Sequence, residues 1–415
     1  MSGFQYVELP AREVLFNEHE PGDCAYVVER GALEISVKRN GERVVLTHIG
    51  PGEIVGELAI LSDERRAATA VALEETVVRK IHADQFARRV LDMDPVMRLL
   101  IETVMKRLHR TVRLLKNDGQ PAPELFDARS PFVDEALESL RLENDIALAL
   151  KRGEMRAFYQ PIVDLRSGKL RAFEALVRWM HPTRGLLAPD QFIPTANESS
   201  LIRQITSFCI TRAAADLPRM RVACLSNPAN VEPVNVNVNV TGRDLESGNI
   251  VDQLNAALAA NGLVGRDLSF EITESSLMVD TTMAARVLDD IRALGTGVAI
   301  DDFGTGFSNM AYLAGLPATT IKIDRSFVSR CFADDEHRKI VVTILRLAQQ
   351  LGMSTVAEGI ETPQEFSLLC DEGAEYGQGF LFAKPMPLDE ALGLIAGWDA
   401  ARAAIGGAPI NVEGA

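Results

Sequence analysis

Short apolar segments alternate with helical patterns along residues 156–382, and this alternation constrains the fold more than any other feature. Eight of these segments have the length and apolar content of buried strands: residues 158–163, 170–176, 234–240, 268–272, 297–301, 320–323, 354–357 and 376–382. Eight strands in about 250 residues predict an α/β fold, a (β/α)8 TIM-like barrel. Only residues 164–169 join the first two strands, too few for a parallel crossover, so we expect an irregular barrel with one antiparallel strand.

Polar side chains stand at the carboxyl ends of these predicted strands, where barrel enzymes carry their catalytic residues. Singly, each could cap a helix or be satisfied within the core, and Asp301 with Asp302 would equally fit a turn. Asn235, Asn237 and Asn239 share one face of their strand. We expect only Asn239 to lie near the mouth of the barrel, the end at which the carboxyl ends of the strands meet. Together, these residues predict a ring of ligands around one point. In chain order they are Glu174, Asn239, Glu271, Glu274, Asp301, Asp302, Lys322, Asp324, Glu358 and Gln378.

The chemistry of this ring indicates hard divalent cations. Oxygen ligands without His or Cys favour Mg²⁺ or Mn²⁺ over zinc. Adjacent carboxylates such as Asp301 and Asp302 repel each other, so a cation between them would make their burial favourable. With this many carboxylates, two ions about 3.5–4 Å apart could share one aspartate, the arrangement used for in-line attack on phosphorus. We therefore expect a phosphodiester substrate.

The region before residue 82 has a different pattern of short, alternating strands broken by Pro-Gly and Asn-Gly pairs. This pattern predicts a small antiparallel β-barrel or sandwich, with a hairpin at Asn40-Gly41. Within it, Gly56 permits a tight strand exit, and a short helical turn over residues 57–61 would offer free N–H groups to a phosphate. Arg66 could clamp that phosphate and Glu57 could accept from a sugar hydroxyl, although both could simply form an exposed ion pair.

Residues 95–116 are predicted to form a connector helix that begins at Asp94-Pro95. Its apolar residues recur at alternating spacings of four and three, with Thr111 between the last two, so this face packs on its own domain or on a second copy: Met97, Ile101, Val104, Leu108 and Leu115. A Pro- and Gly-containing linker follows over residues 117–130, and a further helix is expected from Pro131 to Gly153. The predicted domains are therefore residues 1–94, connector 95–116, linker 117–130, barrel 131–405 and tail 406–415.

Charge and cysteine usage exclude some classes of function. The formal net charge is -15, with 43 basic and 58 acidic residues, which disfavours a nucleic-acid polymer as partner. The five cysteines have no metal or disulfide spacing and fit a reducing compartment. No apolar run reaches the roughly 20 residues that span a membrane, and the N-terminus lacks a signal-peptide core. We therefore expect a cytoplasmic protein.

The sequence Gly56-Glu-Leu-Ala59, followed by Arg66-Ala-Ala-Thr69, resembles the phosphate-binding cassette of cyclic-nucleotide-binding domains. The resemblance implies a cyclic-nucleotide site. It also implies a homodimer, since the connector helix is the dimer seam in catabolite-activator-like relatives. Ala67 stands where cGMP-preferring relatives carry a hydroxyl, which favours cAMP, and Arg65 departs from a common proline. The implied site residues are Gly56, Glu57, Leu58, Arg66, Ala67 and Ala68.

The ends of the predicted barrel strands resemble the EAL-domain phosphodiesterases, which open cyclic di-GMP to linear pGpG. The resemblance covers roughly residues 135–400 and rests on separated motifs in the same order: Glu174-Ala-Leu with Arg178-Trp179, Asn239, Glu271-Ile-Thr-Glu-Ser275, Asp301-Asp-Phe-Gly-Thr-Gly306, Lys322-Ile-Asp324, Ala357-Glu-Gly-Ile-Glu-Thr362 and Gln378-Gly-Phe380.

The resemblance also implies a role for each matched residue. One Mg²⁺ or Mn²⁺ ion would be held by Glu174, Asn239, Glu271 and Asp301, and a second by Asp301, Asp302 and Glu358. Lys322 would orient the attacking water, with Glu358 and Gln378 as further catalytic residues. Glu274 would support the loop after Asp302. The substrate would be contacted by Gln160, Leu176, Arg178 and Asp324.

Two functional hypotheses follow, an enzyme and a silent receptor. The presence of every metal ligand and catalytic residue that the resemblance implies favours the enzyme. The favoured one is a cyclic di-GMP phosphodiesterase regulated by cAMP or a related mononucleotide, with activation expected rather than inhibition. The alternative is a catalytically silent receptor for both nucleotides, which predicts a missing ligand or base. A transcription factor would need a helix-turn-helix after the connector, where the chain instead carries a Pro-rich linker and an acidic barrel.

Overall fold

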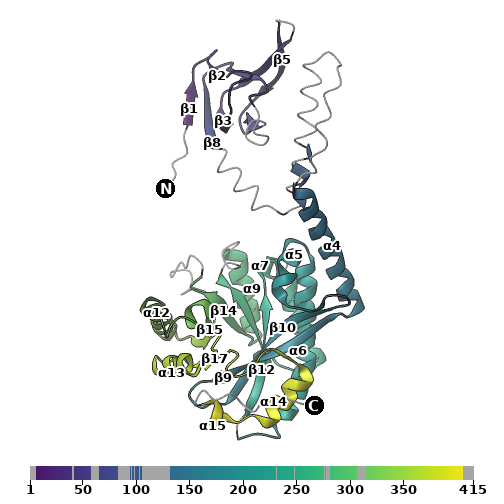
Figure 1. The fold of residues 1–415 in the computed structure, drawn as a ribbon, viewed down its shortest axis with the longest axis vertical. Coiled ribbons are helices and arrows are strands. Elements are labelled where there is room, and N and C mark those ends of the chain that lie inside the picture. Colours follow the sequence, from purple (N-terminus) through teal and green to yellow (C-terminus); the bar gives the residue numbers. More distant parts are fainter. Residues whose placement is uncertain are drawn as a thin grey trace. The chain divides into compact units, whose positions relative to one another are not determined.

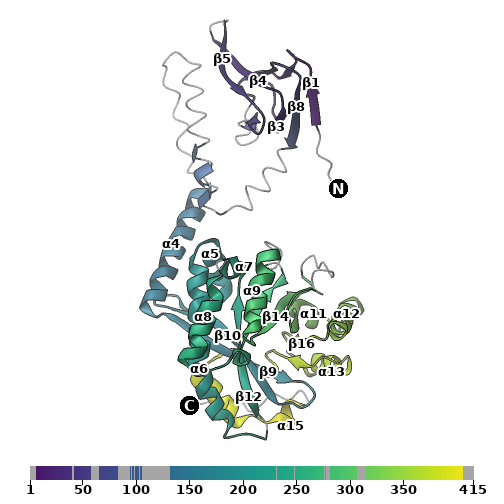
Figure 2. The ribbon, with the colours of Figure 1, turned by 180° about the vertical axis from the view of Figure 1, so that it is seen from behind.

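The computed structural model describes residues 6–39, 42–57, 65–82, 131–229, 231–246, 248–274, 281–305 and 315–404, together with 276 and single residues between 94 and 104. The chain divides into two compact units, Met1–Leu142 and Glu143–Ala415. Figures 1 and 2 show both units from opposite sides, and each is described here by itself.

The first unit is built from two antiparallel sheets of four strands each, with strand orders β1-β8-β3-β6 and β2-β7-β4-β5. The predicted small antiparallel β domain is therefore confirmed as a sandwich. The expected hairpin is also present, since Arg39 pairs with Glu42 across residues 40 and 41, which lie outside the described ranges. The strands are β1 Tyr6–Leu9, β2 Val14–Phe16, β3 Cys24–Arg30, β4 Leu33–Arg39, β5 Glu42–Ile49, β6 Ile54–Val55, β7 Thr69–Ala72 and β8 Thr76–His82.

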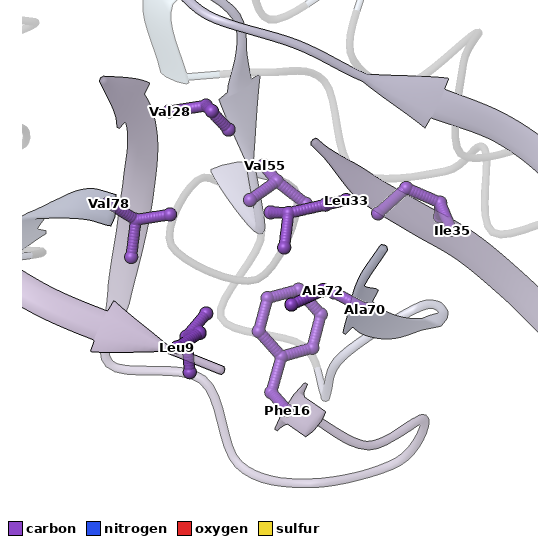
Figure 3. Packing of buried hydrophobic residues seen from close by; sticks show 9 residues of the cluster. All are labelled: Leu9, Phe16, Val28, Leu33, Ile35, Val55, Ala70, Ala72 and Val78. Carbon is purple, nitrogen blue, oxygen red and sulfur yellow. The ribbon is translucent and has the colours of Figure 1, made fainter. Parts of the chain in front are cut away.

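The core of this sandwich comes from the inward-facing residues of both sheets. In β4, Leu33, Ile35 and Val37 are buried because alternate residues of a strand point to one face. β5 lies at the edge of its sheet and is exposed along nearly its whole length. Figure 3 shows the core cluster of Leu9, Phe16, Val28, Leu33, Ile35, Val55, Ala70, Ala72 and Val78.

The predicted connector helix is described only in part. Residues 96–97, 99–101 and 103–104 have helical backbone. Met97, Leu100 and Val104 are about half exposed, whereas Leu108 and Leu115 lie outside the described residues. Pairing of this helix with a second copy therefore stays a prediction.

Helix α4, Pro131–Arg152, has the bounds expected from the sequence. Proline suits the first turn of a helix because its missing N–H would be unpaired there. Gly153 ends the helix with a left-handed φ of 65°, a conformation that glycine adopts without steric cost. Ala136, Ile146 and Ala149 form its buried side.

The second unit contains a closed barrel with strand order β10-β12-β13-β14-β15-β16-β17-β9, completed by pairing of β9 with β10. β9 runs antiparallel to both of its barrel neighbours, β10 and β17, which confirms the irregular barrel expected from the short connection after Asp164. The strands are β9 Met155–Asp164, β10 Leu170–His181, β12 Val231–Val240, β13 Leu268–Thr273, β14 Gly297–Phe303, β15 Thr320–Ile323, β16 Ser354–Ala357 and β17 Tyr376–Gly377.

The last barrel strand is shorter than predicted. The sequence favoured a strand over residues 376–382, but β17 ends at Gly377. A Cβ at Gly379 would lie 2.1 Å from the carbonyl oxygen of Ile360, so the chain passes too close to this backbone for any larger residue. The N–H of Phe382 bonds to the carbonyl of Gly379, which turns the chain away from the sheet.

Helices surround the barrel, and strands β11 Gly185–Leu187 and β18 Met386–Pro387 extend its sheet (Figures 1 and 2). Among the described residues, no helix combines the length and the apolar composition that a membrane crossing requires. Besides α4, the helices are α5 Ile193–Glu198, α6 Leu201–Cys224, α7 Gly242–Glu246, α8 Asn249–Ala260, α9 Thr281–Ala293, α11 Arg325–Val328, α12 Asp335–Leu351, α13 Pro363–Asp371, α14 Leu388–Gly397 and α15 Ala400–Ala403.

Candidate active site

The ammonium group of Lys322, on β15, lies among carboxylates from four other barrel strands: Glu174 within β10, Glu271 and Asp301 near the ends of β13 and β14, and Glu358 directly after β16. Its Nζ atom is 2.7 Å from Glu271 Oε2, 3.1 Å from Asp301 Oδ1 and 3.6 Å from Glu174 Oε2, and it also contacts Glu358 Oε1. The side chain of Lys322 is 1% exposed. The structure therefore brings together at one point residues that are far apart in the sequence, as the strand-end pattern predicted.

The charges of this cluster shift the pKa values of its members in different directions. Burial disfavours the charged form of Lys322, but the surrounding carboxylates raise its pKa well above the usual range. Burial and the charge of Glu174 raise the pKa of Glu271 well above its usual range. Burial raises the pKa of Glu358 to about 8, although Lys322 opposes this change. The cluster is thus a site with more acidic groups than one ammonium can balance.

Asp301 and Asp302 both face the mouth because β14 is irregular there. Consecutive residues of a regular strand point to opposite faces. Asp302, however, has a left-handed φ of 53°, and the pairing of β14 with β15 shifts register between Ile300 and Phe303. Such an irregularity can re-aim a side chain. Burial and the charge of Asp301 raise the pKa of Asp302 to about 6.

Glu174 is held by amide side chains on both carboxylate oxygens. Asn239 Nδ2 donates to its Oε1 at 2.6 Å, and Gln378 Nε2 donates to its Oε2 at 2.7 Å. Burial favours the neutral form, but Lys322 and these two amides hold the pKa of Glu174 below its usual range. Gln378 Nε2 also donates to Gln160 Oε1 at 2.9 Å, and Gln160 in turn donates to the carbonyl of Ala383.

The donor set fits hard divalent cations. Ligand oxygens of Asp301, Asp302 and Glu358 lie within 4.8 Å of one another, and Glu174 and Glu271 also lie close to Lys322 Nζ. Carboxylate and amide oxygens without nitrogen or sulfur ligands suit Mg²⁺ or Mn²⁺. The four carboxylates in contact with Lys322, together with the neighbouring Asp302, leave negative charge that divalent ions would balance.

A cavity of about 600 Å³ opens beside Glu174 and Asn239. Its size lies in the range of small-molecule sites. Of the residues predicted to contact substrate, Leu176 lines this cavity, and Arg178 follows two positions later on the same face of β10. The lining also includes Pro189, Ile193, Asn197, Ile202, Thr206, Thr241 and Arg243.

The remaining predicted residues have identifiable local contacts. Burial lowers the pKa of Arg178, which donates to the carbonyl of Val177 and lies over the Phe158 ring. Asp324 caps α11 by accepting from the N–H of Ser326 at 3.0 Å. Glu274 Oε2 accepts from the N–H of Gly304 at 3.4 Å, in the segment after the two aspartates. Residues 306–314 of that loop lie outside the described ranges.

Sequence reasoning missed three residues of the site. Asn197 and Arg243 line the cavity from helices, and nothing in their local sequence singles them out. Asn237 donates to Glu271 Oε1 at 2.8 Å, although only Asn239 was expected near the carboxylates. The strict Val-Asn alternation was the available signal, and it places Asn237 on the correct face.

In the first unit, Arg66 and Gly56 meet at the predicted phosphate site. Arg66 is 3% exposed, its Nη1 donates to the carbonyl of Gly56 at 2.9 Å, and its guanidinium lies 4.4 Å above the Phe16 ring. Its Nε has no hydrogen-bond partner among the described residues. Gly56 has a φ of 81°, and a Cβ there would meet Arg66 Nη1 at 2.4 Å, so this position requires glycine.

The other residues predicted for the cyclic-nucleotide site lie next to Gly56 or Arg66 in the sequence. Glu57 directly follows Gly56, and Ala67 and Ala68 follow Arg66 in the segment that enters β7. All three are described, and Ala67 and Ala68 are partly exposed. Leu58 lies outside the described residues, as do residues 59–61 of the expected helical turn.

These observations define a two-part protein: a β-sandwich with a buried arginine beside a tight glycine turn, and an irregular barrel with an acidic, lysine-centred mouth. The EAL domain family matches residues 143–385, which is more than half of the chain. The chain belongs to the EAL-domain family. The cyclic nucleotide-binding domain family matches residues 6–92.

Two similar proteins come from Pseudomonas aeruginosa. The cyclic di-GMP phosphodiesterase NbdA is 36% identical over 289 residues, 70% of this chain and 35% of the relative. The bifunctional diguanylate cyclase/cyclic di-GMP phosphodiesterase MucR is 31% identical over 380 residues, 83% of this chain and 54% of the relative. The chain thus spans about a third to about half of the length of these relatives.

Solved structures of the EAL enzyme Bd1971 match most of the length of this chain. Its cAMP-bound form is 33% identical, with a TM-score of 0.71, and the match covers 94% of this chain and 100% of that one. A form with both cAMP and cyclic di-GMP bound is 34% identical, with a TM-score of 0.70 and the same coverage.

Proposed function

We propose that this protein hydrolyses cyclic di-GMP to linear pGpG and that cAMP bound to the first unit regulates this reaction. The observation that carries the proposal is the complete buried cluster around Lys322, to which four other barrel strands each contribute a carboxylate. The names of the relatives and the cAMP-bound form of Bd1971 support the same assignment.

The acidic mouth would hold two Mg²⁺ or Mn²⁺ ions. One would be bound by Glu174, Asn239, Glu271 and Asp301, and the other by Asp301, Asp302 and Glu358. When bound, such ions stabilise developing negative charge on a phosphodiester and make water more acidic. The group of Asp301, Asp302 and Glu358 already places three ligand oxygens within 4.8 Å of one another.

The hydrolysis adds one water across one phosphodiester bond. The water oxygen forms a bond to phosphorus, the bond from phosphorus to a ribose 3′ oxygen breaks, and this oxygen leaves with a proton. Lys322 Nζ orients the water by hydrogen bonding. Glu358 would accept the proton of the water on a carboxylate oxygen, as the general base. Gln378 keeps Glu174 and Gln160 in place through its two amide hydrogen bonds.

The substrate would lie along the mouth and enter the cavity beside Glu174. Arg178 supplies a positive charge for a substrate phosphate, and Leu176 supplies an apolar wall for a base. Gln160 and Asp324 would add hydrogen bonds to the dinucleotide. In this arrangement the ions held by the carboxylates would balance the charge of the reacting phosphate, and the cavity residues would fix its orientation.

The first test is turnover of cyclic di-GMP by the purified full chain, followed as pGpG by chromatography. Product is expected with Mg²⁺ or Mn²⁺, and removal of divalent ions by EDTA should abolish it, because the acidic mouth alone supplies no Lewis acid. Re-addition of Mn²⁺ should restore the rate. Binding of cyclic di-GMP without product under either metal would reject the enzyme and support a receptor.

The same assay tests the regulatory role of Arg66. Replacing Arg66 by lysine should weaken cAMP binding by about 10- to 100-fold, because the planar fork and its charge-assisted hydrogen bonds are lost. The cAMP-dependent rise in pGpG formation should disappear at moderate cAMP concentrations. Calorimetric titration with cAMP gives the affinity directly.

Arg65→Lys is the matched control for this substitution. Arg65 is exposed and its Nη1 donates to the carbonyl of His19, so this variant should keep the response to cAMP. An unchanged cAMP affinity in a folded Arg66→Lys variant would exclude Arg66 as the phosphate ligand.

A further inference from the structure

Asn237 lies two residues before the proposed metal ligand Asn239, on the same face of β12. Its Nδ2 atom donates to Glu271 Oε1 at 2.8 Å. Asn237 is 8% exposed and Glu271 is 1% exposed, so neither group has ready access to water. A buried amide that contacts a buried carboxylate in this way restricts the orientation of that carboxylate.

The contact repeats an arrangement that Glu174 shows on the neighbouring strand. Asn239 Nδ2 donates to Glu174 Oε1 at 2.6 Å. Two asparagines at alternate positions of β12 therefore each hold one glutamate of the mouth. The period of two in a strand explains why both side chains face the barrel interior.

Both carboxylate oxygens of Glu271 have a partner. Lys322 Nζ lies 2.7 Å from Oε2, and Asn237 Nδ2 lies 2.8 Å from Oε1. With Oε1 fixed by Asn237, the Oε2 atom stays directed toward Lys322 and the centre of the cluster. Without the Asn237 amide, the Glu271 carboxylate could rotate away from Lys322 and from the centre of the cluster.

We propose that Asn237 is a positioning residue that orients Glu271 for binding of the divalent cation. The inference rests on the proposed function, in which Glu271 is a metal ligand. Partners that orient a ligand from outside its coordination sphere contribute about 10- to 100-fold to metal affinity or activity. Asn237 supplies such a contact and does not line the cavity beside Glu174.

Asn235 provides a matched control on the same strand and the same face. Its Nδ2 donates to Ser269 Oγ at 3.4 Å, and its Oδ1 has no hydrogen-bond partner among the described residues. Among the described residues, the side chain of Asn235 therefore makes no hydrogen bond to a carboxylate of the Lys322 cluster. Replacing either asparagine by alanine removes the same side-chain atoms.

The experiment measures Mn²⁺ affinity by isothermal titration calorimetry on the full chain, without substrate. Asn237→Ala should weaken Mn²⁺ binding by about 10- to 100-fold, and Asn237→Ser should weaken it less if its hydroxyl still reaches Glu271. Asn235→Ala should leave the affinity unchanged. In turnover assays, saturating Mn²⁺ should restore most of the rate of Asn237→Ala, which a purely structural defect would not show.

The outcomes separate this inference from the proposed function. Wild-type Mn²⁺ affinity in a folded Asn237→Ala variant would overturn the inference and leave the phosphodiesterase assignment intact. Unfolding of both Asn237 variants beside a folded Asn235→Ala would also overturn it, since Asn237 would then serve the fold. A wild-type chain that binds Mn²⁺ but forms no pGpG would reject the enzyme, while a weaker Mn²⁺ affinity of Asn237→Ala would still support the positioning role.

Discussion

Replacing Lys322 by methionine is expected to lower hydrolysis of cyclic di-GMP by at least about 1,000-fold, because it removes both the charge and the hydrogen-bond donors proposed to orient the water. Methionine matches the length of the lysine stem, so packing around the side chain changes little. Steady-state formation of pGpG at saturating Mn²⁺ measures the effect.

The same substitution should destabilise the metal-free protein. Lys322 contacts Glu271, Asp301 and Glu358, and these buried carboxylates would lose their common counter-charge. Breaking a buried ion pair by removing one partner costs about 3–5 kcal/mol. Thermal unfolding followed by circular dichroism should show a lower melting temperature, and Mn²⁺ should recover part of the loss.

Lys339→Met, on the exposed side of α12, is the control and should leave both the rate and the melting temperature unchanged. A folded Lys322→Met variant with wild-type turnover would exclude Lys322 from the reaction.

Much of the barrel could be predicted because its strands are short, apolar and regularly spaced. The alternation of Val and Asn in β12 places the valines toward the helices and the asparagines toward the interior. The short connection after Asp164 fixed the antiparallel pairing of β9 with β10. The strand ends then placed Glu174, Glu271 and Asp301 at one mouth, because parallel strands of a barrel end at one face.

The irregular parts of the site could not be predicted in this way. Strict alternation would send Asp302 away from Asp301, and only the left-handed φ and the register shift of β14 bring both to the mouth. The early end of β17 depends on the close approach of Gly379 to Ile360. Both features arise from contacts between distant segments, which no local pattern encodes.

Side-chain conformation explains the other differences between the predicted and the observed site. Asn237 was placed on the correct face, but its contact with Glu271 depends on the conformation of both side chains. Arg66 was expected at a phosphate site, and its stacking on Phe16 depends on the pairing of β2 with β7. Period and spacing predict the direction of a side chain, whereas its partners depend on the packing of the whole unit.

Replacing Asp301 by asparagine is expected to abolish activity through a different physical route. Asp301 is the carboxylate proposed to be shared by both ions, and asparagine keeps its shape while removing its charge. Because residues that merely orient a ligand contribute about 10- to 100-fold, loss of a shared ligand should lower turnover by more than about 100-fold. Calorimetric titration should show that fewer Mn²⁺ ions bind to each chain.

Unlike Lys322→Met, this substitution should leave the metal-free protein at least as stable as the wild type. Lys322 keeps its contacts with Glu271 and Glu358, and the repulsion between Asp301 and Asp302 disappears. Burial and the charge of Asp301 raise the pKa of Asp302 to about 6, so this pKa should fall in the variant, which carboxyl ¹³C NMR titration can follow. Asp371→Asn, at the exposed end of α13, is the control.

The two substitutions together test the electrostatic account of the site. Both should remove activity, but loss of the central cation should lower metal-free stability and loss of one surrounding carboxylate should not. Equal destabilisation by Lys322→Met and Asp301→Asn would show that packing, rather than the excess of negative charge, determines the stability of the cluster. A lower stability in Asp301→Asn alone would contradict the proposal that the mouth is poised to bind divalent cations.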